Sequence, residues 1–136
     1  MPHVLKLEKE TDLPMPKGQD DAARRFYGKL LGLREVMKTP GERGVWFDAK
    51  GTLLRLRYTD PMPAPTTEVK AHLHVDNAEG FRVAAQNARL RAWDAPAITG
   101  TRGLIVSDPF GNRLELREYR TAAARERVAE DAGPDE

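Results

Sequence analysis

The sequence contains no cysteine, which excludes disulfides, thiolate metal sites and cysteine nucleophiles. It has no apolar run of about 18 residues, so no membrane-spanning helix is expected. The first residues pass at once into a charged stretch, which is not the pattern of a secretory signal peptide. The net charge is only +1, and no basic stripe with interleaved aromatic residues predicts binding to nucleic acid. These absences predict a cytoplasmic protein with neither a membrane nor a nucleic acid as partner.

The chain has 136 residues, which fits a single domain of the commonest size. Hydrophobic residues make up 40% of the sequence, enough for a core, and charged residues make up 32%, as on an ordinary solvated surface. We therefore expect one globular domain.

The sequence repeats itself at an offset of 60 residues. Residues 46–57 align with residues 106–117 without a gap, and the same offset places Leu13 over Leu73. The identical pairs in this alignment are Asp48/Asp108, Gly51/Gly111, Leu54/Leu114, Leu56/Leu116 and Arg57/Arg117. The repeat predicts a duplicated structural unit.

Each half has the pattern of a strand, a helix and three further strands. In the first half the helix is expected to be capped by Asp20 or Asp21 and to end at Gly32. In the second half Asn77 is expected to cap the helix. The strands are expected at residues 4–13, 33–38, 43–48 and 52–58, and at residues 70–75, 91–95, 102–107 and 113–119. The pattern predicts an α+β fold of two βαβββ modules.

The segment between the halves, residues 59–66, contains three prolines and is expected to be an extended linker. It separates module one, about residues 4–58, from module two, about residues 67–120, within one domain of residues 1–120. Residues 121–136 form a polar, alanine-rich tail in which Arg127 and Asp131 have helical spacing. We expect this tail to be a frayed helix followed by disorder, and we assign it no function.

Two segments resemble the hallmark segments of the vicinal oxygen chelate (VOC) superfamily. They are Phe26-Tyr-Gly-Lys-Leu-Leu-Gly-Leu33 and Asp108-Pro-Phe-Gly-Asn-Arg-Leu-Glu115. That superfamily includes glyoxalase I, the bleomycin-resistance proteins, extradiol dioxygenases and fosfomycin-resistance enzymes. Residues 13–24, 44–47 and 70–72 are similar to a bacterial branch of small, single-domain glyoxalase-like proteins. The resemblance covers about residues 10–118, and it says little about the reaction because this fold carries many.

The resemblance implies paired modules that form a half-open, eight-stranded mixed barrel, commonly in a homodimer. In the metal-dependent members, four strands each supply one ligand, usually His, Gln or Glu. The corresponding positions here are Glu10, Arg55, Lys70 and Glu115. His3 is the alternative for the first position, but the loop match that begins at Leu13 favours Glu10.

Two of these four residues cannot bind a metal ion. The guanidinium of Arg55 and the ammonium of Lys70 have donors but no acceptor, and their charges repel a cation. A divalent cation needs three or more oxygen or nitrogen ligands. We therefore expect an ion-paired cluster in place of a metal, and no metal or other cofactor. A bound divalent metal is the disfavoured alternative.

Alternation along the strands predicts a polar face that lines a binding cleft. Lys70, His72 and His74 share one face of their strand. Arg55 and Arg57 share a face of a second strand, and Glu115 lies on the polar face of a third. The alternative is that these faces are the solvated side of an antiparallel sheet.

Several further roles stay open. Glu115 or His72 can act as a general base, although His72 can equally be a structural histidine. The aromatic residues that can stack on a planar substrate are Trp46, Phe47, Trp93 and Phe110. Core or dimer packing is the favoured role for most of them, and Trp46 is the one that we expect in the cleft wall. Lys70 is disfavoured as a Schiff-base nucleophile because nearby carboxylates would keep it charged.

Three functions are compatible with these residues. The first is a metal-free binding protein that sequesters a small polar or aromatic molecule, as the bleomycin-resistance proteins do. The second is a metal-independent lyase or isomerase that uses Glu115 or His72 as its base, with Arg55 and Lys70 stabilising a developing anion. The third, a metal-dependent glyoxalase I or dioxygenase, is disfavoured by the ligand substitutions. The sequence does not separate the first two.

Overall fold

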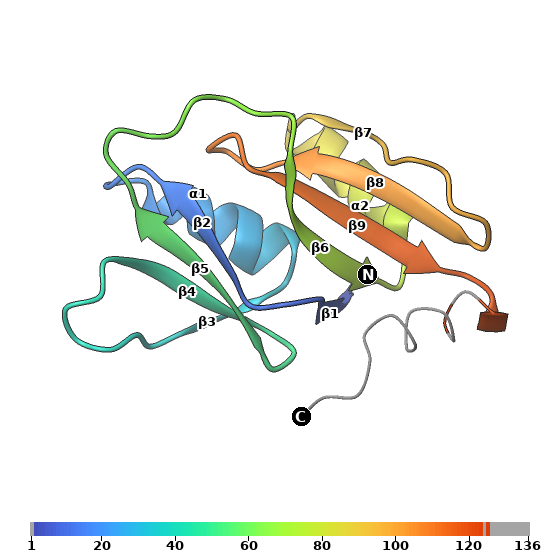
Figure 1. The fold of residues 1–136 in the computed structure, drawn as a ribbon, viewed down its shortest axis with the longest axis horizontal. Helices are drawn as coiled ribbons and strands as arrows, with labels where there is room; N and C mark the ends of the chain where they lie inside the picture. The colour runs from blue at the N-terminus through green and yellow to red at the C-terminus, as the bar shows by residue number, and fades with distance from the viewer. Residues whose placement is uncertain (1, 124, 126–136) are drawn as a thin grey trace.

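The computed structural model describes residues 2–123 and 125 (Figure 1). The predicted tail contacts of Arg127 and Asp131 lie outside these residues. The first half of the chain contains β1 (Val4–Leu7), β2 (Thr11–Met15), α1 (Asp20–Ala23), the π-helix η1 (Arg24–Leu30), β3 (Arg34–Val36), β4 (Gly44–Ala49) and β5 (Thr52–Tyr58). The second half contains β6 (Val69–Val75), α2 (Ala78–Asn87), β7 (Ala92–Asp94), β8 (Thr101–Ser107) and β9 (Arg113–Tyr119).

The strands form two mixed sheets, and the four strands of each module follow the same order within their sheet. The first-module sheet has the order β2-β5-β4-β3, and the second-module sheet has the order β1-β6-β9-β8-β7. In each sheet the first strand of the module pairs in parallel with its last strand, and the other pairs are antiparallel. The predicted α+β fold of two βαβββ modules is therefore confirmed. The two sheets do not close on each other, which agrees with a half-open barrel.

The N-terminal segment differs from the single strand expected over residues 4–13. It bends at Glu8–Glu10 and forms β1 and β2, which belong to different sheets. β1 pairs antiparallel with β6 of the second module, whereas β2 pairs in parallel with β5. Both strands contribute to the core, since Val4 and Leu7 of β1 and Leu13 of β2 are all buried.

The first helix also begins differently from the prediction. Its cap position is Gln19 and no side chain caps it, so neither Asp20 nor Asp21 has the predicted role. The Asp20 carboxylate instead accepts hydrogen bonds from the hydroxyl of Tyr58, at 2.9 and 2.8 Å. The second helix begins as predicted, because the Asn77 side chain accepts from the backbone N–H of Gly80 at 2.9 Å.

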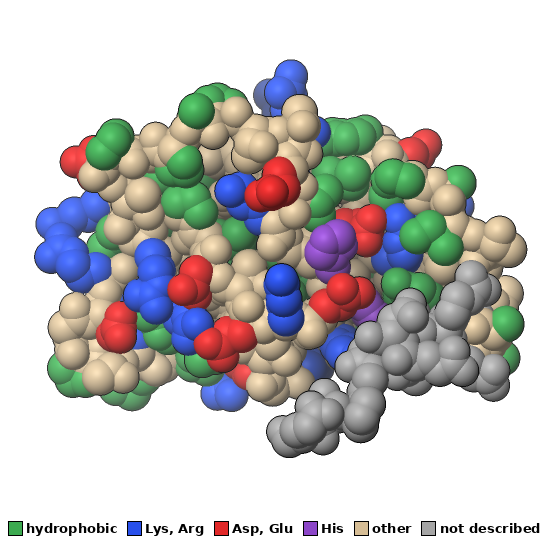
Figure 2. All heavy atoms as spheres, in the orientation of Figure 1, with side chains coloured by type: hydrophobic (Ala, Val, Ile, Leu, Met, Phe, Trp, Pro, Cys, Tyr) green, Lys and Arg blue, Asp and Glu red, His purple; other side chains and the backbone are tan. Residues whose placement is uncertain are grey.

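The helices cover one side of both sheets, and the polar sides of the strands face the other way (Figures 1 and 2). The core between helices and sheets includes Phe26, Tyr27, Phe47, Phe81 and five leucines of the central strands, all at most 2% exposed. These leucines are Leu54, Leu56, Leu73, Leu114 and Leu116. Alternation along β5, β6 and β9 therefore points the intervening side chains away from the core. None of the helices in the described residues is long and apolar enough to cross a membrane.

Candidate functional site

Acidic and basic side chains alternate on the polar face of the first-module sheet (Figure 2). We call this group the Arg55 network; its members are Glu10, Asp12, Glu42, Arg55 and Arg57. The parallel register of β2 and β5 sets Asp12 beside Arg55. Arg55 donates to Asp12 through Nε at 2.6 Å and to Glu10 through Nη2. Arg57 donates to Asp12 at 3.0 Å and to Glu42 at 3.2 Å.

The Arg55 network is partly open to water. The Arg55 side chain is 20% exposed, but those of Glu10 and Asp12 are 56% and 45% exposed. Burial alone would raise the pKa of Asp12, but hydrogen bonds from Arg55 and Arg57 outweigh it and hold that pKa below its ordinary value. Asp12 is therefore a carboxylate at neutral pH, with its charge matched by the two arginines.

Trp46 lies underneath this network. It is the cross-strand neighbour of Arg55, and the guanidinium carbon of Arg57 stands 5.1 Å from the centroid of its ring. That distance permits a cation–π interaction. Only 6% of Trp46 is exposed, so it supports Arg57 and offers little surface to a ligand.

The second-module sheet carries another polar group on the same side of the molecule, where histidine and acidic side chains gather over β6 and β9 (Figure 2). We call it the Glu115 network; its members are His72, Thr101, Glu115 and Arg117. The register of β6 and β9 places His72 beside Glu115, and Nδ1 of His72 lies 3.1 Å from Oε1 of Glu115. Arg117 donates to the other carboxylate oxygen at 2.9 Å. The carboxylate is thus held from both sides.

Arg117 is the most enclosed member, at 2% exposure. Its Nη1 donates to the Thr101 hydroxyl at 2.8 Å, and its Nη2 also donates to the Pro96 carbonyl at 3.1 Å. Gly103 makes room for it, since a Cβ at that position would lie 2.7 Å from Cζ of Arg117. The buried Nε of Arg117 has no hydrogen-bond partner among the described residues.

The Glu115 carboxylate is ionised at neutral pH because Arg117 and His72 stabilise its negative charge. Burial alone would raise its pKa, but hydrogen bonds from Arg117 and then His72 hold that pKa below its ordinary value. The Glu115 side chain is 16% exposed and that of His72 is 44% exposed. Of these two side chains, His72 is therefore the more accessible to a molecule on this face.

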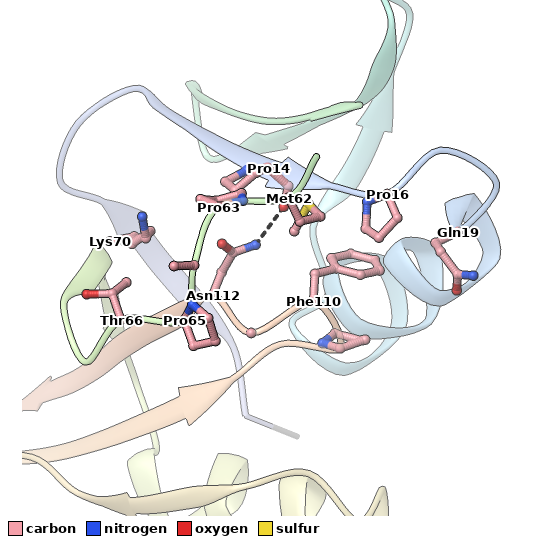
Figure 3. Close-up of a pocket in the computed structure, with 13 residues that line it drawn as sticks. Pro14, Pro16, Gln19, Met62, Pro63, Pro65, Thr66, Lys70, Phe110 and Asn112 are labelled. Atoms are coloured by element: carbon pink, nitrogen blue, oxygen red, sulfur yellow. Dashed lines mark hydrogen bonds between the residues drawn. The ribbon is translucent and has the colours of Figure 1, made fainter. Parts of the chain in front are cut away.

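A hollow of about 330 Å³ lies at the junction of the modules (Figure 3). The linker contributes Met62, Pro63, Ala64, Pro65 and Thr66; the remaining wall consists of Pro14, Pro16, Gln19, Lys70, Pro109, Phe110, Gly111 and Asn112. Asn112 is buried between the two modules: its Nδ2 donates to the Pro14 carbonyl at 3.0 Å and to Asp108 at 2.9 Å. Lys70 is the lining residue that the sequence analysis had placed in the binding cleft.

The predicted cleft residues lie in three separate places: the Arg55 network, the Glu115 network and the hollow at the module junction. Glu10 and Arg55 are ion-paired, but Glu115 is paired with Arg117 and His72. Lys70 makes no ion pair with any residue in 2–123 or 125, so the four positions do not form one mutually paired cluster. His74 contacts Glu8 at 2.8 Å, and His3 contacts Asp76 at 3.0 Å, so His3 does not join Glu10.

Sequence reasoning did not identify Asp12 as a site residue or Arg117 as the partner of Glu115. A signal for both was available. Asp12 shares the strand face of Pro14, opposite the buried Leu13, and Arg117 follows Glu115 by two residues. What was missing was the pairing of β2 with β5, which sets Asp12 beside Arg55.

The four positions do not fit a divalent metal. Arg55 and Lys70 supply no lone pair, and the carboxylates of Glu10 and Glu115 already accept from arginines. Across the described residues, no three His, Cys, Asp or Glu side chains are grouped so as to hold a metal ion. The chemistry of these four residues therefore disfavours metal coordination.

Comparison with protein-family models matches residues 13–116 to the Glyoxalase/Bleomycin resistance protein/Dioxygenase superfamily. A search of curated proteins finds no match to this chain.

Solved structures with the same fold include three from bacteria. A protein from Bacillus anthracis described as a glyoxalase family protein has a TM-score of 0.70 and 25% identity, covering 82% of this chain and 93% of its own. Lactoylglutathione lyase from Agrobacterium tumefaciens has a TM-score of 0.63 and 22% identity, covering 82% and 92%. The fosfomycin resistance protein FosX from Listeria monocytogenes has a TM-score of 0.67 and 12% identity, covering 86% and 95%. The last two likenesses show the fold alone.

Proposed function

Because the chain belongs to the Glyoxalase/Bleomycin resistance protein/Dioxygenase superfamily, we propose that it binds a small polar or aromatic molecule without a metal ion, as a sequestration-type protein. The candidate binding surfaces are the polar faces of the two sheets and the hollow at the junction of the modules. One observation carries the proposal: Arg55, at a position where metal-dependent members have a ligand, is engaged with Glu10 and Asp12. A guanidinium held in this way organises acidic side chains and excludes a cation.

The types of relative are compatible with this function. One structural neighbour is described as a fosfomycin resistance protein, and the superfamily name includes bleomycin resistance. Sequestration requires only a surface that recognises the molecule. It needs no metal to activate an oxygen atom, so the replacement of ligands by arginine and lysine does not abolish it.

The proposal is tested by ligand binding in the presence of EDTA. We expect at least one member of a panel of small acids, thiol adducts and antibiotics to raise the melting temperature of the EDTA-treated protein. We also expect titration with zinc, nickel and manganese to show no tight stoichiometric binding. Stoichiometric metal binding that is required for a ligand response would overturn the proposal, and so would the failure of every compound to bind.

A second candidate is a metal-independent lyase or isomerase, and the contact between His72 and Glu115 favours it. The carboxylate orients the imidazole through Nδ1, and the half-exposed ring can accept a proton from a bound substrate through its other nitrogen. Glu115 itself is a weak base because its pKa is lowered, first through Arg117 and then through His72, against the raising effect of burial. The structure therefore favours His72 over Glu115 as the base of this candidate.

This candidate is tested with the hemithioacetal of glutathione and methylglyoxal, assayed in EDTA. Turnover that His72→Gln abolishes and His3→Gln preserves would support it. His3→Gln is the matched control because His3 also contacts a carboxylate, that of Asp76, at 3.0 Å. Turnover that appears only when a divalent metal is added would instead support the metal-dependent glyoxalase.

A further inference from the structure

The hollow beneath the linker has an unusual lining for a protein surface. Five of its lining residues are prolines: Pro14, Pro16, Pro63, Pro65 and Pro109. Proline has no backbone N–H and a fixed φ, so these residues present rigid hydrocarbon surfaces and few donors. Phe110 adds an aromatic ring to the same wall. A surface of this kind favours a flat, apolar molecule.

The charge of the hollow comes from Lys70. No carboxylate lies among the lining residues, and Lys70 makes no ion pair with any residue in the described part of the chain. The arginines on the polar strand faces, Arg55, Arg57 and Arg117, each have an acidic partner, so Lys70 differs from them. An ammonium group beside a hydrocarbon wall attracts an anion more strongly than one in open water, because the wall lowers the local dielectric constant.

Lys70 and the apolar wall line the same hollow, so a single ligand can contact both. Figure 3 shows Lys70, Thr66 and Pro65 on one side of the hollow, Phe110, Met62 and Pro16 on the other, and Asn112 between them. The cation and the aromatic ring are thus separated across the hollow. A volume of about 330 Å³ is at the lower end of the range for small-molecule sites.

We infer that this hollow binds a small organic anion with a flat apolar body, whose anionic group pairs with Lys70 and whose body packs against Phe110 and the prolines. The inference rests on the proposed small-molecule binding and names the class of ligand and the place where it binds. The linker then has a second role besides joining the modules, because Met62 and Pro63 form part of the wall.

The test uses ligands that separate charge from shape, with EDTA present throughout. Benzoate and cinnamate carry both features, benzamide and cinnamamide lack the charge, and acetate lacks the flat body. We expect the two aromatic acids to bind by calorimetry at least tenfold more tightly than either the amides or acetate. Equal binding of acid and amide, or no binding of either aromatic acid, would overturn the inference.

Substitutions in the lining test whether the aromatic acids bind in this hollow. Lys70→Met should weaken binding of the aromatic acids at least tenfold, whereas Lys29→Met, at an exposed lysine of η1, should leave it unchanged. Phe110→Leu keeps much of the side-chain volume and should also weaken binding, because it removes the ring. Binding that survives Lys70→Met but is lost in His72→Gln would overturn this inference and leave the proposed function intact. If no compound of any class binds, both fail.

Discussion

Arg55 and Arg117 lie on the polar faces of corresponding last strands, β5 and β9, but their surroundings differ. The carboxylate partners of Arg55 are about half exposed, whereas Arg117 is 2% exposed and its partner Glu115 is 16% exposed. Water therefore screens the first group of ion pairs and hardly reaches the second. The contribution of an ion pair to stability depends on its exposure to water more than on the distance between its charged atoms.

Replacing each arginine with alanine should separate the two networks by stability. Arg117→Ala leaves the largely enclosed Glu115 carboxylate without its arginine partner, and we expect it to lower the free energy of unfolding by about 3–5 kcal/mol. Arg55→Ala removes partly exposed pairs, and we expect a loss of about 1 kcal/mol or less. Thermal or urea unfolding of both variants measures the contrast. Similar losses in the two variants would contradict it, and Arg117→Lys provides a milder variant should Arg117→Ala not fold.

At the residue scale, sequence reasoning identified the charged side chains but not their partners. Alternation predicted that Arg55, Arg57, His72 and Glu115 point away from the core, and they do. The partner of each charged side chain depends on which strands lie next to one another and on which side chains are enclosed together. Lys70 and Glu115 were expected in one cluster, but Glu115 is held by Arg117, two residues further along its own strand.

Among the elements, the loop Asp108–Asn112 has a role that its sequence suggested only in part. It makes the turn between β8 and β9, with Gly111 at a φ of 90°. It also joins the modules, because the buried Asp108 accepts from the hydroxyl of Tyr27 at 2.5 Å, while Asn112 donates to the carbonyl of Pro14. The hallmark segments that define the family resemblance are thus in direct contact with each other.

Removing the Tyr27 hydroxyl should weaken this junction. Tyr27→Phe deprives the buried Asp108 of a donor, and we expect it to lower the free energy of unfolding by about 1–3 kcal/mol. Tyr58→Phe is the matched control: its hydroxyl also donates to a carboxylate, that of Asp20, but at a partly exposed site. We expect it to cost less than about 1 kcal/mol. Denaturant unfolding compares the two, and an equal or larger loss in Tyr58→Phe would contradict the role given to Tyr27.

The N-terminal segment is the element that sequence reasoning described least well. Its mixture of apolar and charged residues indicated a strand but not the bend at Glu8–Glu10. β1 depends on β6, a strand more than 60 residues away, for its hydrogen bonds. No local pattern specifies such a partner, because pairing is decided by which sheet edge is available.

For the whole molecule, the lowered pKa values have a consequence for stability in acid. The pKa values of Asp12, Glu35, Asp76 and Glu115 all lie below their ordinary values. A carboxylate of this kind stabilises the folded state at pH values above its ordinary pKa. That stabilisation is lost as the pH falls below the ordinary pKa, which is 4.5 for the two glutamates and 3.8 for the two aspartates, and then through the lowered pKa. Asp108 acts in the opposite direction, because burial raises its pKa.

We therefore expect the free energy of unfolding to fall as the pH decreases from 5 toward 3. Glu115 should carry the largest single part, because it is the least exposed of the four carboxyl groups that contribute in this direction. In Glu115→Gln the dependence on pH should be shallower, so the difference from the original protein should shrink in acid. Urea unfolding at several pH values measures both slopes, and parallel curves would contradict this assignment.

The oligomeric state of the protein is a prediction from the family resemblance. The family resemblance implies a homodimer, and sedimentation equilibrium should then give twice the mass of one chain. The cytoplasmic location likewise remains an expectation from the sequence.

By itself, the sequence determined the duplicated α+β fold, the strands of each module except the division of the N-terminal segment into β1 and β2, and the side of the sheets on which the charged residues lie. These follow from periodicity and from the 60-residue repeat, which are local or internal properties of the chain. Only the tertiary structure decided which charges meet: Arg55 with Asp12, Glu115 with Arg117, and Lys70 with no carboxylate of the described chain. Arg55 and Asp12 pair across neighbouring strands, whose register exists only once the sheet is assembled. Glu115 and Arg117 share one strand, but the enclosure of Arg117 against Thr101 and Pro96 depends on the assembled structure.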